Sequence, residues 1–164
     1  MEKSPVLIIR PYSEADRPFL RTLYLSSRRS NWHWLTGDDW QLEDFDSLIL
    51  GEQVLVAMAD QQRAGFAAWS PVNNFLHSLF VNPDYQRGGV GSALLQQVQQ
   101  QFTATGSLKC MAKNHAAHQF YLQHGWEDIA CGEAEEGPYI LMHYPHHHRV
   151  DSDDADTTIT GRGN

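Results

Sequence analysis

The segment that most constrains the fold of this chain is residues 79–95, LFVNPDYQRGGVGSALL. Its apolar beginning predicts a strand that ends at Val81, and the Pro-Asp pair after it predicts a turn. Three glycines then fall within four positions. A helix is predicted next, because apolar side chains recur at helical spacing: Val90, Leu94, Leu95 and Val98. The segment is therefore a strand, a glycine-rich loop and the start of a helix.

The glycine-rich loop predicts an anion-binding site. Glycine has no side chain to block the close approach of a ligand to the backbone. The helix behind the loop begins with N–H groups that lack intrahelical partners, and this end carries roughly half a positive charge. The predicted ligand is a phosphate or pyrophosphate group.

Three kinds of phosphate-binding loop could have this arrangement, and two of them do not fit. A P-loop ends in Gly-Lys-Ser or Gly-Lys-Thr, but Gly91 is followed by Ser-Ala, so no lysine can reach a phosphate. A dinucleotide-binding loop requires a third glycine where Leu94 stands and an acidic residue about 20 residues further on. The next predicted strand, residues 107–112, reads SLKCMA and has no acidic residue.

The remaining pattern is Gln86-x-x-Gly89-x-Gly91, which resembles the acyl-coenzyme A loop of the GNAT superfamily of N-acetyltransferases. A second block follows about 25 residues later and reads Asn114-x-x-Ala117-x-x-Phe120-Tyr121-x-x-x-Gly125-Trp126. Asn114 can cap a helix there and Gly125 can end it. In the order strand, helix, strand, helix, strand, the two blocks resemble the coenzyme-binding half of a GNAT enzyme. The resemblance spans roughly residues 6–144.

The resemblance implies an α/β (α+β) fold, with a mixed, mostly antiparallel sheet of about six to seven strands flanked by about four helices. The sheet would be splayed between the strand ending at Val81 and the strand at residues 107–112. Composition predicts one domain, because 41% hydrophobic and 20% charged residues are ordinary for a globular protein. The resemblance implies that residues 1–145 are a single N-acetyltransferase domain. Residues 146–164 are expected to form a polar, mobile tail.

Local patterns predict further elements. The uniformly apolar residues 6–10 predict a strand too apolar to be half exposed. The other expected elements are a hairpin formed by residues 53–59 and 63–70, a helix that begins at residue 38 or 39, and an acidic loop at residues 132–137 before the last strand.

The resemblance also assigns the coenzyme site. The backbone near Phe80 and Val81 would contact the pantetheine arm of acetyl-coenzyme A, which is the expected co-substrate. Asn114 would contact the coenzyme from the second block. Amides of the glycine-rich loop would bind the pyrophosphate; the loop set is Gln86, Arg87, Gly88, Gly89, Val90, Gly91 and Ser92.

Tyr121 matches the family tyrosine that faces the thioester sulfur. The leaving thiolate needs a proton or a hydrogen-bond donor, and a phenol with a pKa near 10 stays protonated at neutral pH. The alternative is that Tyr121 only packs in the core beside Phe120.

The sequence leaves more than one candidate for the general base. An amine must be neutral when it attacks, so a carboxylate, a histidine or a chain of water molecules collects its proton. Related sequences often carry an acidic residue four positions before the final valine of this strand, and His77 stands there. Imidazole suits the task with an unperturbed pKa near 6.5, although His77 could also line the sheet without transferring protons. His33, between two tryptophans, is the second candidate.

An acceptor site could be formed by the aromatic segment between the first two helices. Its candidate residues are Trp32, His33, Trp34 and Trp40. They could wall a ligand pocket or pack in the core. With the carboxylates of Asp38, Asp39 and the acidic loop nearby, a cationic amine would suit the site through cation–π attraction and charge pairing.

Composition excludes several other classes. A net charge of −8 argues against nucleic-acid or anionic-membrane binding. No long apolar run or signal peptide is present, which favours a cytoplasmic protein; it could be a monomer or a homodimer. No metal-ligand spacing is found, and the two cysteines, Cys110 and Cys131, are expected to be buried, reduced thiols.

The sequence therefore predicts an enzyme that transfers an acetyl group from acetyl-coenzyme A to a primary amine of a small molecule or peptide, directly, in a ternary complex. A covalent route through Cys110 is disfavoured by its place inside an apolar strand. The alternative function is a non-catalytic module that senses acyl-coenzyme A.

Overall fold

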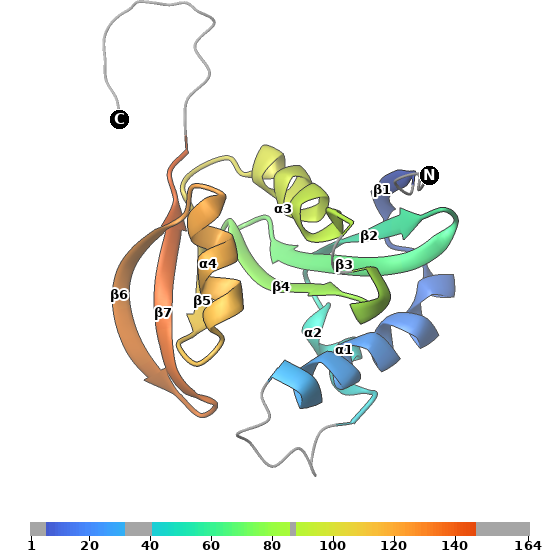
Figure 1. The fold of residues 1–164 in the computed structure, drawn as a ribbon, viewed down its shortest axis with the longest axis horizontal. Helices are drawn as coiled ribbons and strands as arrows, with labels where there is room; N and C mark the ends of the chain where they lie inside the picture. Colours follow the sequence, from blue (N-terminus) through green and yellow to red (C-terminus); the bar gives the residue numbers. More distant parts are fainter. Residues whose placement is uncertain (1–5, 32–40, 86–87, 147–164) are drawn as a thin grey trace, which may run out of the picture.

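The computed structural model describes residues 6–31, 41–85 and 88–146, and every structural statement below refers to these residues. They form one seven-stranded sheet in the order β1-β2-β3-β4-β5-β7-β6 (Figure 1). The strands are β1 Leu7–Pro11, β2 Gln53–Ala59, β3 Gln62–Ser70, β4 Phe75–Val81, β5 Gly106–Met111, β6 Glu127–Ala134 and β7 Gly137–Tyr144. The helices are α1 Arg17–Asn31, α2 Asp44–Leu48, α3 Val90–Gln101 and α4 His115–Gln123, with short 3-10 turns at Glu14–Asp16 and Pro83–Tyr85.

All neighbouring strands are antiparallel except β4 and β5, which are parallel. The prediction of a mixed, mostly antiparallel sheet flanked by about four helices is therefore confirmed.

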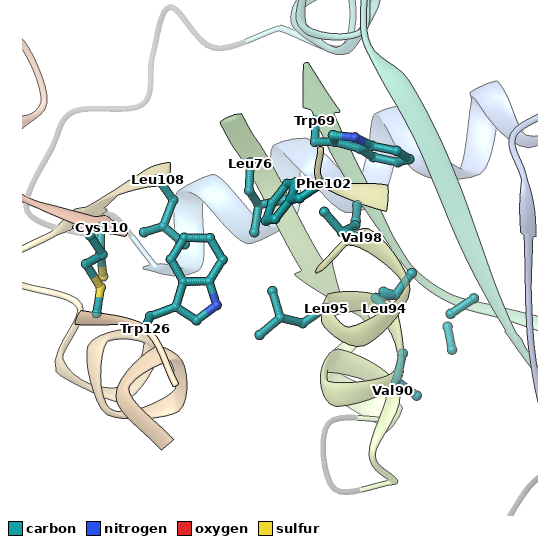
Figure 2. Close-up of a cluster of buried hydrophobic side chains, with 14 of the residues drawn as sticks. Trp69, Leu76, Val90, Leu94, Leu95, Val98, Phe102, Leu108, Cys110 and Trp126 are labelled. Atoms are coloured by element: carbon teal, nitrogen blue, oxygen red, sulfur yellow. The ribbon is translucent and has the colours of Figure 1, made fainter. Parts of the chain in front are cut away.

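The two faces of the sheet have separate apolar clusters. On one face, Leu20 and Leu23 of α1 and Phe45 of α2 pack against Val56 and Phe66 of the sheet. On the other face, α3 contributes the stripe that its sequence predicts, and all four residues of the stripe are fully buried. Figure 2 shows this stripe together with the aromatic and aliphatic residues of the second cluster. Helices thus cover both faces of the sheet (Figure 1).

The sheet is splayed in its middle. Strands β4 and β5 pair at only two positions, Phe75 with Ser107 and Leu76 with Leu108. Both positions are at the beginning of the two strands, which then diverge (Figure 1). From His77 onward, the β5-facing edge of β4 therefore has no strand partner. This leaves backbone hydrogen-bonding groups available to a ligand.

Three expectations need correction, and a fourth falls partly outside the described ranges. Strand β1 lies at the edge of the sheet, where Leu7 and Ile9 pack against the core but Ile8 is 56% exposed. Helix α2 begins at Asp44, after a turn in which the Asp44 side chain accepts a hydrogen bond from the Gln41 amide, and the expected start at residue 38 or 39 lies outside the described residues. The expected acidic loop is mostly strand, since only Glu135 and Glu136 separate β6 from β7. Of the two thiols, Cys110 is buried but Cys131 is exposed.

Candidate active site

His77 lies where the splay begins. In the β3–β4 register, Trp69 lies opposite Leu76 and Ala68 lies opposite Ser78, so His77 is the extra residue of a bulge. It also follows directly after Leu76, the last residue of β4 that pairs with β5. Bulges re-aim side chains and are frequent next to active sites.

The imidazole of His77 is held on two sides. Its Nδ1 lies 2.8 Å from Oε1 of Glu52, and its ring centroid lies 4.5 Å from that of Phe75. The His77 side chain is 43% exposed. One ring nitrogen therefore has a protein partner, and the ring remains accessible from outside the sheet.

Tyr121 lies over the other side of the splay. It is on α4, and its ring packs edge to face against Phe120 at 5.4 Å and Trp126 at 5.9 Å. Burial raises the pKa of the Tyr121 phenol well above its ordinary value, and the nearby Cys110 of β5 raises it further. The phenol is therefore protonated at neutral pH and can donate a hydrogen bond.

Cys110 itself is a poor nucleophile. Burial raises the pKa of its thiol to about 11, with a further contribution from the charge of Asp128. At neutral pH almost all of the side chain is therefore the neutral thiol, which does not attack a thioester.

The first turn of α3 presents amides that the helix itself does not use. Gly89 caps the helix in the left-handed conformation, with φ of 81°. The amide of Ala93 donates to the Gly89 carbonyl at 3.0 Å. The three preceding amides, those of Val90, Gly91 and Ser92, have no intrahelical acceptor. Gly88 differs, because its amide donates to the Tyr85 carbonyl at 3.2 Å.

The two predicted coenzyme blocks meet at this helix end. A Cβ at Gly91 would lie 3.4 Å from the Phe120 ring and 3.6 Å from Val81, so α4 and the end of β4 both approach the first turn of α3. A second link, which no sequence pattern predicts, joins α4 to α3 through His124. Nδ1 of His124 lies 2.8 Å from the Phe120 carbonyl and Nε2 lies 2.9 Å from the Ser92 hydroxyl. Because a carbonyl only accepts, Nδ1 of His124 donates to it and carries a proton.

The side chain of Asn114 already has a structural task. Its Oδ1 accepts a hydrogen bond from the Ala117 amide at 3.2 Å and caps α4. Its NH₂ group retains the donors that could serve a ligand. The Phe80 ring packs in the cluster that α1 covers, with its centroid 5.3 Å from that of the Tyr24 ring. Its carbonyl oxygen points toward β3, where a Cβ at Gly65 would lie 2.5 Å from it.

Charged groups gather near Tyr24 on the same face of the sheet. Burial raises the pKa of Tyr24, Arg28 lowers it, and Asp44 and Glu136 raise it. Arg28 also lies 5.2 Å from the centre of the Tyr24 ring and 3.1 Å from Asp44. The turn between β6 and β7 therefore brings an acidic side chain within electrostatic range of α1.

Several predicted site residues lie outside the part of the chain that the structure describes: Gln86 and Arg87 of the loop, and Trp32, His33, Trp34 and Trp40 of the aromatic segment. Within the described ranges, no three His, Cys, Asp or Glu residues are grouped so that they could hold a metal ion. No helix of those ranges is long and apolar enough to cross a membrane.

Comparison with known proteins adds sequence evidence. The model of the acetyltransferase (GNAT) family matches residues 17–126. The chain is also 29% identical over 130 residues to the peptidyl-lysine N-acetyltransferase YiaC of Escherichia coli, and the match covers 78% of this chain and 71% of that relative.

Solved structures share the fold. The PaiA N-acetyltransferase of Thermoplasma acidophilum, in complex with coenzyme A, has a TM-score of 0.70 at 17% identity and covers 86% of this chain and 99% of its own. The spermidine N-acetyltransferase of Vibrio cholerae, in complex with coenzyme A and spermine, has a TM-score of 0.66 at 14% identity, with coverages of 84% and 94%. The ribosomal-protein-S18-alanine N-acetyltransferase of Escherichia coli has a TM-score of 0.65 at 23% identity, with coverages of 85% and 94%.

Proposed function

This chain belongs to the acetyltransferase (GNAT) family, and on that basis we propose that it transfers the acetyl group of acetyl-coenzyme A directly to a cationic primary amine, with His77 and Tyr121 handling the protons. The expectation of an acetyltransferase is confirmed by the family match, which favours an enzyme over a non-catalytic sensor. The direct route, the class of amine and the residue roles are the proposed part.

The observation that carries the proposal is the splay between β4 and β5. Pantetheine contains amide groups, and an unpaired strand edge offers N–H and C=O groups to bind them. The β5-facing edge of β4 beyond Leu76 is such an edge. Of the two predicted contacts, Val81 is the one whose backbone can face it, because the Phe80 carbonyl points toward Gly65 of β3. The pyrophosphate would then reach the amides of Val90, Gly91 and Ser92 at the N-terminus of α3.

A thioester in the splay would lie between a base and an acid. His77 begins the splay on β4, and Tyr121 packs near Cys110 of β5 on the other side. The ammonium group first gives one proton to His77, which passes it to solvent. The neutral nitrogen then attacks the thioester carbonyl carbon, forming the C–N bond, and loses its second proton to His77. The C–S bond then breaks, and the coenzyme A thiolate takes a proton or a hydrogen bond from Tyr121. The products are the acetylated amine and coenzyme A.

The charged groups around Tyr24, on the face of the sheet that α1 covers, support a cationic amine as the acceptor. Among the described residues, the charged groups that act on the Tyr24 phenol are one guanidinium, Arg28, and two carboxylates, Asp44 and Glu136. Two proteins similar to this chain are named for cationic acceptors, peptidyl-lysine and spermidine. A ring face and carboxylates both attract an ammonium group, which is deprotonated only when it reaches the base.

The test is thiol release from acetyl-coenzyme A with a panel of amines. We expect spermidine and an N-acetyl-lysine amide to give higher kcat/KM than glycine amide or γ-aminobutyrate. Replacing Glu136 with Gln should raise KM for the cationic amines more than it changes kcat, while Glu127→Gln on β6 is the matched control. Neutral or acidic amines that outperform the cationic ones would contradict the proposed acceptor class.

A further inference from the structure

We propose that Glu52 is a positioning residue that holds His77 in the tautomer and orientation in which its Nε2 can accept the proton of the amine. The proposal rests on the proposed role of His77 as the base. Glu52 lies between α2 and β2, is 25 residues away in sequence and belongs to neither coenzyme block.

Glu52 is an unusually buried carboxylate. Its side chain is only 8% exposed. Carboxylates are almost never this buried without a partner, because loss of hydration disfavours the charged form. Nδ1 of His77, at 2.8 Å from Oε1, supplies a partner at the distance of a strong hydrogen bond.

The backbone fixes Glu52 in this position. Gly51 adopts a left-handed conformation with φ of 74°, and the Glu52 amide donates to the Ile49 carbonyl at 3.0 Å. The next residue, Gln53, starts β2 opposite Trp69 of β3. A hydrogen-bonded turn and a strand therefore hold the carboxylate from both sides.

The hydrogen bond determines which nitrogen of His77 carries the proton. An ionised carboxylate can only accept, so Nδ1 donates and the neutral ring has its lone pair on Nε2. Since the side chain is 43% exposed, that lone pair can face an incoming amine or a bridging water. When Nε2 takes a proton, the ring becomes an imidazolium, and the adjacent carboxylate stabilises the new charge.

The location of the pair favours this role over a purely structural one. His77 is the bulged residue of β4 and is the first residue past the β4–β5 pairing. Its backbone is therefore less constrained than that of its neighbours, and the contacts with Glu52 and Phe75 fix the ring instead.

A double-mutant cycle tests the proposal. The variants are Glu52→Leu, His77→Gln and the double variant, with the exposed Glu127→Leu as the control for loss of a carboxylate. We expect Glu52→Leu to lower kcat by about 10- to 100-fold, as removal of supporting hydrogen-bond partners typically does, with KM for acetyl-coenzyme A unchanged. In the His77→Gln background, the same change should cost almost nothing, because Glu52 acts through His77.

Two outcomes of the cycle would overturn the role of Glu52: an equal loss in both backgrounds, or full activity of Glu52→Leu beside an impaired His77→Gln. Full activity of His77→Gln has a different meaning, because it removes His77 as the base and the role of Glu52 with it.

A spectroscopic measurement on the wild-type chain reads the tautomer directly, without comparing activities. Nitrogen-15 NMR distinguishes the two imidazole tautomers, and the His77 signals are assigned by their absence in His77→Gln. We expect a neutral His77 protonated at Nδ1, and a mixture of tautomers in Glu52→Leu. A wild-type ring protonated at Nε2 would overturn the proposal.

Discussion

The ring of Tyr121 packs edge to face against Trp126 at 5.9 Å, and the Trp126 indole N–H donates to Oε1 of Gln99 on α3 at 2.9 Å. Tyr121 is thus held by a side chain that is itself bonded to α3, the helix that follows the glycine-rich loop. A residue fixed in this way can present its hydroxyl in one direction.

Replacing Tyr121 with Phe keeps the ring and removes only the hydroxyl. We expect kcat to fall by about 10²- to 10⁴-fold, the usual contribution of a general acid, while the Kd for coenzyme A changes little. Thiol release and calorimetry measure the two quantities. Because the pKa of Tyr121 is raised, the wild-type phenol stays protonated, so turnover should show no loss from its deprotonation up to about pH 9. Unchanged turnover in Tyr121→Phe across that range would remove Tyr121 from the mechanism.

Asp16 is a fully buried carboxylate bound by two arginines. Arg10 donates to both of its oxygens at 2.7 and 2.9 Å, and Arg63 donates at 2.6 Å. Breaking a buried ion pair typically costs about 3–5 kcal/mol, so Asp16→Asn should lose stability of that order in urea unfolding at neutral pH.

The contacts of Asp16 with the two arginines also predict that the folded chain loses stability in acid. In the folded chain the pKa of Asp16 lies far below its usual range. The hydrogen bond from Arg10 is the largest cause, and the hydrogen bond from Arg63 lowers the pKa further. The stabilisation is therefore complete above the unfolded pKa of about 4 and is lost as the pH falls below it. Between about pH 5 and 3, wild-type stability should fall more steeply than that of Asp16→Asn. Parallel pH profiles would contradict this origin of acid sensitivity.

Gly65 on β3 allows β4 to lie close beside it. A Cβ at Gly65 would lie 2.5 Å from the Phe80 carbonyl oxygen, a backbone atom that cannot move independently. Gly65→Ala should therefore destabilise the chain by about 1–3 kcal/mol in urea unfolding. It should also weaken coenzyme A binding, because a displaced Phe80 would move the adjacent Val81, whose backbone is proposed to bind the pantetheine arm.

Gly91→Ala is the matched control for stability. The added Cβ would make only ordinary contacts, the nearest at 3.4 Å from Phe120, and alanine favours a helix by up to about 1 kcal/mol over glycine. Its unfolding free energy should stay near the wild-type value. A Gly65→Ala variant as stable as Gly91→Ala would show that β4 shifts freely.

The two thiols should react at very different rates. Cys131 is exposed, whereas Cys110 is buried with its pKa raised to about 11. A disulfide reagent near neutral pH should label Cys131 quickly and Cys110 only as the chain opens. Cys131→Ser should abolish the fast phase and leave acetyl transfer intact. A fast phase that persists in Cys131→Ser would mean that Cys110 is accessible and would reopen the covalent route.

The sequence pattern correctly predicted the helices whose apolar spacing and capping residues lie within one short segment. The stripe of α3 and the capped helix α4 follow from spacing and caps over about a dozen residues, and the structure has both. Residues 132–137 contain two glycines and were expected to form a loop. Gly132 instead lies opposite Tyr139 in the β6–β7 ladder, and a Cβ there would lie 2.5 Å from the tyrosine ring. Glycine at this position leaves room for a cross-strand aromatic ring, which no local pattern reveals.

Contacts between residues far apart in the sequence could not be predicted either. Glu52 and His77 are 25 residues apart, and each looks ordinary in its own segment. Only the pairing of β2, β3 and β4 brings them together. The edge position of β1 was missed for a related reason, since an apolar run indicates a strand but does not say how many neighbours the strand has.

The most direct test is a crystal structure of the chain with coenzyme A. We predict that the pantetheine arm lies along β4 in the splay, that the diphosphate contacts the first turn of α3, and that the sulfur lies within about 3.5 Å of the Tyr121 hydroxyl, the reach of a hydrogen bond to sulfur or thiolate. A coenzyme bound with its sulfur outside the splay, away from both His77 and Tyr121, would contradict the proposed active site.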